Sequence, residues 1–199
     1  SNDDYETFCG SYTMAIEALT TLETSLEQFD AIPDGVPERV DALAEDLDGL
    51  DRTYVETSQA ERTAAAEADD PAAAATHWLD TYRRHVAAHE AGWDRMDDRT
   101  TLAADDGIEQ IAAETVDALV AHADALETAG ENREDDDAEA AREHYETAID
   151  RLHAADDVAE KWDATDDTID DRIAALEEKI DRTKWEWGAP DGDGEESGP

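Results

Sequence analysis

The spacing of the large apolar residues constrains this chain more than any other feature of its sequence. They recur every three or four positions, the spacing that places side chains on one face of an α-helix. Runs that alternate polar and β-branched residues, as a half-buried strand would, do not occur. The pattern therefore predicts an all-α protein. In residues 4–30 it consists of Tyr5, Phe8, Tyr12, Ile16, Leu19, Leu22, Leu26 and Phe29.

Turn and capping signals divide this pattern into separate helices. Residues 33–37 contain two prolines and a glycine, which end the first helix. Asp70 and Pro71 fit the N-cap and the first position of a third helix, and Gly130 fits the C-cap of a fourth. The second helix has apolar residues spaced alternately by four and three, as in a coiled-coil seam. These are Val36, Val40, Leu43, Leu47, Leu50 and Tyr54.

The last apolar seam extends from Tyr145 to Trp187. One helix over residues 138–187 would be about 75 Å long at 1.5 Å per residue. Alternatively, the polar run 163–171 divides the seam between two helices. We expect an antiparallel helical bundle or coiled coil of four to six helices with a long C-terminal helix. Residues 1–187 would form a single elongated domain, and residues 188–199 a disordered acidic, Gly-rich tail.

Charge is the second feature that constrains the fold. The chain has 56 acidic residues and only 15 basic ones, which gives a formal net charge of −41. Such a chain repels itself in ordinary buffer. Molar salt shortens the Debye length to about 3 Å and screens the repulsion. The many Asp, Glu and Ala residues and the scarce Lys resemble the composition of proteins from halophilic archaea. That resemblance implies a salt-rich habitat and no particular activity.

The content of large apolar residues is low enough to fit disorder as well. Leu, Ile, Val and Phe together number 29 of 199 residues. The chain nevertheless has five Trp and five Tyr, and its large apolar residues keep the helical spacing. We therefore expect a folded protein with a thin, Ala-rich core.

Several classes of function are disfavoured. Cys9 is the single cysteine, so an intrachain disulfide or a zinc cluster of cysteines is excluded. Basic residues are too few for nucleic acid binding. No run approaches the roughly 18 apolar residues of a membrane-spanning helix. We expect a protein partner or a homodimer, with cations bound nonspecifically to the acidic surface.

Histidines are the one group that suggests metal chemistry. His85 and His89 are four residues apart on one helical face, and His122 lies in the apolar register of the next helix. These three are candidate metal ligands, and the alternative is that they pack as ordinary side chains. The paired Glu-x-x-His motifs of di-iron bundles and the His-Glu-x-x-His motif are absent. No catalytic residue and no cofactor is predicted.

Trp185 and Trp187 near the C-terminus are candidate interaction residues, because Trp is enriched at interface hot spots. The leading hypothesis is a non-catalytic helical scaffold or protein-interaction module of a halophilic organism, with exposure at the cell surface as an option. One alternative is a helical sensor domain that binds a small ligand in an aromatic-lined pocket around Trp78, Tyr82, His85, His89 and Trp93. The other is a metal-dependent bundle enzyme that uses His85 and His89. We expect a soluble protein, either cytoplasmic in a salt-accumulating cell or extracellular after removal of an N-terminal segment.

Overall fold

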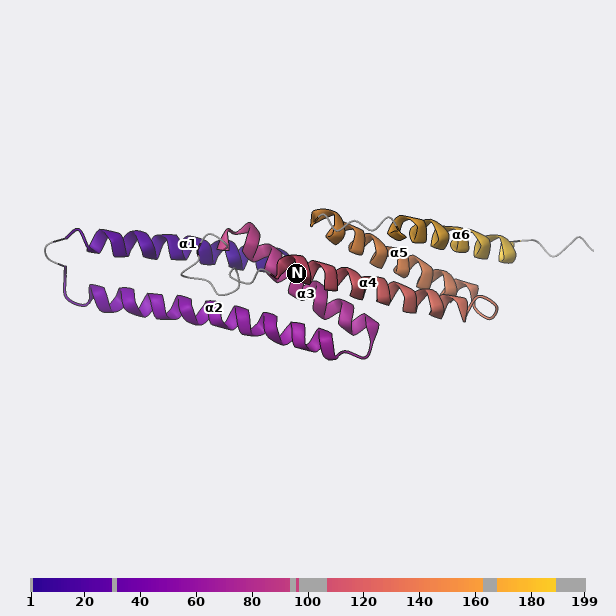
Figure 1. Ribbon diagram of the computed structural model, residues 1–199, viewed down its shortest axis with the longest axis horizontal. Coiled ribbons are helices and arrows are strands. Elements are labelled where there is room, and N and C mark those ends of the chain that lie inside the picture. The colour runs from indigo at the N-terminus through magenta and orange to yellow at the C-terminus, as the bar shows by residue number, and fades with distance from the viewer. Residues whose placement is uncertain (1, 30–31, 94–95, 97–106, 163–167, 189–199) are drawn as a thin grey trace, which may run out of the picture. The chain divides into compact units, whose positions relative to one another are not determined.

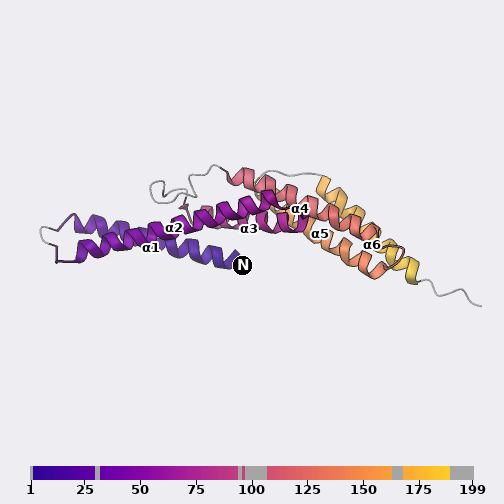
Figure 2. The same cartoon turned by 90° about the horizontal axis from the view of Figure 1, so that it is seen from below.

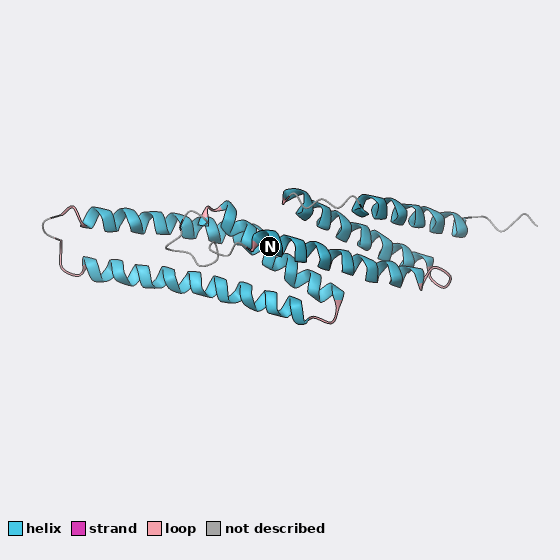
Figure 3. Cartoon of the chain, in the orientation of Figure 1, coloured by secondary structure: helices cyan, strands magenta, loops and turns pink. Residues whose placement is uncertain are grey.

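The computed structural model describes residues 2–29, 32–93, 96, 107–162 and 168–188, without the side chains of Asn2 and residues 184–188. In these residues the chain forms six α-helices and no β-strand (Figures 1 and 3), which confirms the predicted all-α class. The expected tail at 189–199 lies outside the described residues. The helices are α1 (Asn2–Leu26), α2 (Val36–Glu67), α3 (Pro71–Glu90), α4 (Ile108–Glu131), α5 (Ala138–Lys161) and α6 (Thr168–Gly188).

Local sequence signals set several helix ends. The Asp70 carboxylate accepts a hydrogen bond from the backbone N–H of Ala73 at 3.3 Å, and α3 begins at Pro71 as predicted. Asp137 likewise accepts from the N–H of Ala140 at 3.1 Å and caps α5. Gly92 follows α3 with a φ of 81°, a left-handed conformation that glycine adopts without strain.

The chain divides into two compact units. The first contains residues 1–69 and 76–112, and the second contains residues 70–75 and 113–199. Each unit has a buried apolar cluster of its own. The single domain expected over residues 1–187 stays a prediction.

In the first unit, α1 and α2 form a long helical hairpin (Figures 1 and 2). Three of the buried residues of α2, Val40, Leu47 and Tyr54, lie one heptad apart and belong to the same cluster as Ile16 and Leu19 of α1. Ala87 and Ala88 near the end of α3, and Trp93 three residues after it, complete the cluster.

In the second unit, α5 and α6 pack side by side (Figure 1). The long C-terminal seam is therefore shared by two helices, which is the second of the two alternatives read from the sequence. Small residues line much of this core, since Ala141, Ala148 and Ala155 are completely buried on α5. Leu119 of α4 and Ile169 of α6 pack in the same cluster. Small side chains allow helices to approach closely, and these buried alanines fit the Ala-rich core that the composition predicted.

Gly130 has a different role from the predicted C-cap. It lies inside α4, and it is not among the glycines with a positive φ. A Cβ atom at this position would come within 2.5 Å of the Tyr145 ring. The glycine therefore makes room for that ring, which is fully buried and donates a hydrogen bond from its hydroxyl to Glu134 at 2.5 Å.

Candidate interaction surface

Exposed apolar side chains gather in one part of the molecule. Among the described residues, every large hydrophobic side chain with an exposed surface lies between residues 14 and 50, that is, in α1, in α2 or at the turn between them. Isolated exposed apolar residues are ordinary, but a concentration of them marks an interaction surface. The residues are Met14, Leu22, Phe29, Ile32, Leu43 and Leu50, and their exposed fractions range from 36% to 65%.

The coiled-coil spacing of α2 explains this exposure. Its apolar residues form two rows, each with one residue per heptad. The row with Val40, Leu47 and Tyr54 is buried, whereas Leu43 and Leu50 in the other row are 42% and 47% exposed. The hairpin thus buries one row of α2, whereas in the second row Val36 is half-buried and Leu43 and Leu50 remain exposed.

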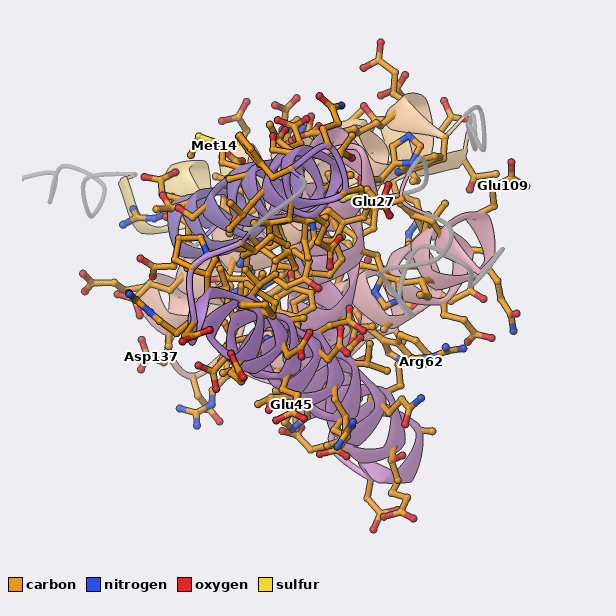
Figure 4. The ribbon with its side chains drawn as sticks, turned by 90° about the vertical axis from the view of Figure 1, so that its left-hand side faces the viewer. Met14, Glu27, Glu45, Arg62, Glu109 and Asp137 are labelled. Carbon is orange, nitrogen blue, oxygen red and sulfur yellow. The ribbon has the colours of Figure 1, made fainter. Side chains whose placement is uncertain are left out.

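A groove of about 500 Å³ lies where the second row of α2 meets α1. Leu22 forms its wall on α1, and Val36 and Leu43 form part of its wall on α2. The charged residues that line it are Arg39 and Asp46, which are seven residues apart on α2. We call this feature the hairpin groove. Figure 4 views the hairpin from its tip, where Met14 on α1 and Glu45 on α2 project away from the helix pair.

The charge of the hairpin is more one-sided than that of the whole chain. Residues 2–67 contain 17 acidic residues and three basic ones, Arg39, Arg52 and Arg62, and Arg39 is the only basic residue before position 52. Glu38, Asp41 and Asp46 near the groove are exposed, as is Glu27 just after α1. The apolar groove therefore lies in a strongly negative environment with one cation.

An aromatic cluster fills the other end of the first unit. The rings of Phe8, Tyr12, Tyr54 and Trp93 come from α1, α2 and the end of α3, and their centroids are 4.8 to 6.5 Å apart. The Trp93 indole donates a hydrogen bond to the Cys9 carbonyl at 3.4 Å. Of the aromatic residues predicted to form a pocket, Trp93 and Tyr82 are buried and Trp78 is half-buried. Rings that touch in this way form a packed core at this point.

Hydrogen bonds next to this cluster connect α1, α2 and α3. The Cys9 thiol donates to the Tyr54 hydroxyl at 3.4 Å, and that hydroxyl donates to the Arg84 carbonyl at 3.0 Å. Burial raises the pKa of the Cys9 thiol, although the hydrogen bond to Tyr54 acts in the opposite direction. Burial also raises the pKa of Tyr54, so both groups stay protonated at neutral pH. A thiol of this kind packs as a small apolar group.

The three candidate metal ligands have different surroundings. His85 is buried, with Nδ1 2.9 Å from the Thr81 carbonyl oxygen, whereas His89 on the same helix is exposed. His122 belongs to the second unit, and burial, followed by the charge of Arg151, lowers its pKa. Within the described part of the chain, no three His, Cys, Asp or Glu residues form a group that could hold a metal ion. The metal-dependent alternative stays a prediction.

Trp185 and Trp187 lie in α6, but their side chains are outside the described residues. Their role in an interaction therefore also stays a prediction. The sequence analysis missed the hairpin groove, although its signal was present: the 4-3 spacing of α2 supplies more apolar residues than one neighbouring helix can cover.

No helix in the described ranges combines the length and apolar character needed to cross a membrane. Comparison of the chain with protein-family models, with curated proteins and with solved structures gives no significant match.

Proposed function

We propose that this protein is a non-catalytic helical scaffold, or protein-interaction module, of a salt-adapted organism. The observation that carries the proposal is the hairpin groove, lined by the exposed Leu43, together with the exposed Leu50 one heptad further along α2. Large apolar side chains that remain in water are unfavourable by about 25 cal/mol for each Å² exposed. A partner that covers them recovers this free energy.

The form of the groove favours a helical partner and a coiled-coil type of contact. In a coiled coil, a neighbouring helix packs its own apolar seam against a row of residues one heptad apart. The partner is a different protein or a second copy of this chain. In molar salt, screening of the charge of −41 allows either one to approach.

Site-specific photo-crosslinking tests this function. A photoreactive amino acid replaces Leu43 in the groove or, as a matched control, Ala60, an exposed residue further along α2. We expect one discrete adduct from position 43 and none from position 60, in extracts of the source organism kept in about 3 M KCl. Static light scattering on the purified chain then distinguishes a foreign partner from a homodimer.

A monomeric protein that gives no adduct, or equal adducts at both positions, would contradict the proposal. Introduction of a charge at the groove, as Leu43→Asp, should abolish the adduct formed by a photoreactive residue at position 22. Ala60→Asp adds the same charge to the same helix and should leave that adduct unchanged.

A further inference from the structure

We propose that the occupant of the hairpin groove is a cationic amphipathic helix of another protein, which places its apolar stripe along α2 and its Arg or Lys residues against the surrounding acids. This inference rests on the proposed function and specifies the partner. Its grounds are the shape of the groove and the distribution of charge around it.

The shape indicates a helix about four turns long. Val36, Leu43 and Leu50 follow one another at seven-residue intervals on a single uninterrupted helix, α2. From Val36 to Leu50 the helix advances by 14 residue steps, about 21 Å along its axis at 1.5 Å per residue, and the groove lining on α2 extends from Val36 to Asp46. An amphipathic helix that docks in a groove uses apolar anchors at matching intervals. Leu22 forms the opposite wall, so the incoming helix contacts both α1 and α2.

The charge distribution favours a foreign helix over a second copy, and most strongly at low salt, where the charges are least screened. Of the 15 basic residues in the chain, only Arg39 lies in residues 1–51, which contain 14 acidic residues. Two copies joined through their hairpin grooves would bring two such acidic segments together. Like charges placed opposite each other disfavour a partner, whereas complementary charges favour it.

Asp46 is the acidic residue in the lining of the groove that a cation of the partner would contact. It lines the groove beside the apolar row and is exposed, so its carboxylate is available to a cation at the edge of the incoming stripe. The second charged residue of the lining, Arg39, lies one heptad toward the start of α2. Arg on the partner suits Asp46 because the guanidinium group can bind a carboxylate through two hydrogen bonds.

Synthetic helical peptides supply the test, with the full chain as the receptor. Three labelled peptides of about 18 residues have the same composition of apolar residues. The first has a heptad stripe flanked by Arg, the second has the same stripe flanked by Glu, and the third keeps the Arg residues but has its apolar positions scrambled. Fluorescence anisotropy measures each Kd from about 3 M KCl down to the lowest salt at which circular dichroism still reports the native helicity.

We expect the Arg-flanked stripe to bind at least about tenfold more tightly than either of the other peptides at the lowest salt used. The difference from the Glu-flanked peptide should shrink as salt rises, because screening weakens charge pairs more than apolar contact. Leu43→Asp should weaken binding of the Arg-flanked peptide about tenfold or more, and Ala60→Asp should not weaken it. Asp46→Asn should reduce the preference for Arg over Glu flanks without removing binding.

Equal affinity for Arg and Glu flanks overturns the inference about charge and leaves the groove as a docking site. Equal affinity for the scrambled peptide also overturns it, because binding is then general attraction to an acidic surface. If the chain binds no peptide but forms a dimer that Leu43→Asp dissociates, the occupant of the groove is a second copy of the chain. That result also overturns the inference. A monomer that binds none of the peptides overturns the inference, and the photo-crosslinking result then decides separately whether the proposed function also fails.

Discussion

Two helical glycines should respond to the same substitution with opposite sign. Gly49 in α2 has nothing within 4 Å of the position that a Cβ would occupy, whereas a Cβ on Gly130 in α4 would be 2.5 Å from the Tyr145 ring. Replacement of glycine by alanine in a helix interior favours folding by about 0.5 to 1 kcal/mol when space is available. Gly49→Ala should therefore stabilise the protein by about that amount.

At Gly130 the steric cost exceeds this gain. The Tyr145 ring is fully buried, so it can make room only by displacing its neighbours. Overpacking of a well-packed core costs about 1 to 3 kcal/mol. A displaced ring also strains the hydrogen bond from Tyr145 to Glu134, which contributes about 1 kcal/mol. Gly130→Ala should thus destabilise the protein by about 1 to 3 kcal/mol.

Urea unfolding in molar KCl, followed by circular dichroism at 222 nm, measures both changes. The decisive comparison is a double-mutant cycle with Tyr145→Leu, which removes the ring that a Cβ at position 130 would meet. In that background Gly130→Ala should cost far less or become stabilising. An equal cost in both backgrounds, or a stabilising effect of Gly130→Ala in the wild-type protein, would refute the steric reasoning.

Three further predictions concern charge and protonation. Lys179→Met removes ion pairs to Glu127 at 2.6 Å and Glu131 at 2.5 Å. It should lower the free energy of unfolding by about 1 kcal/mol in low salt and by less in high salt, where the charges are screened. Urea titrations at two KCl concentrations measure the difference. Burial, followed by the charge of Arg151, holds the pKa of His122 below its ordinary value of 6.5. The neutral imidazole therefore contributes its full stability above pH 6.5, and this contribution is lost as the pH falls toward the pKa of His122 in the folded protein. His122→Gln should therefore flatten the decline in stability between about pH 7.5 and 5, and an unchanged decline would argue against this role. Desalting should cause a marked loss of helical circular dichroism, because the charge of −41 is then unscreened; equal helicity without salt would count against salt adaptation.

The sequence by itself determined which segments are helical and where several of them begin. Helical periodicity and capping arise from interactions within a few residues, so they can be read locally. Asp70 and Pro71 start α3 as the sequence indicates, and the polar run beginning at residue 163 falls where α5 gives way to α6. The all-α class follows from the same local information.

Tertiary structure alone decided which of two similar apolar residues is buried. Val40 and Leu43 belong to the same seam, yet Val40 is 7% exposed and Leu43 is 42% exposed, because Val40 packs into the core of the first unit and Leu43 lies at its edge. His85 and His89 differ for a related reason, since neighbouring helices cover only part of the surface of α3. The role of Gly130 could not be predicted from the sequence either, because it depends on contact with the ring of Tyr145 from the next helix. Burial depends on contacts between residues far apart in the chain, and a periodic pattern defines a helical face without specifying which helix, if any, will cover it.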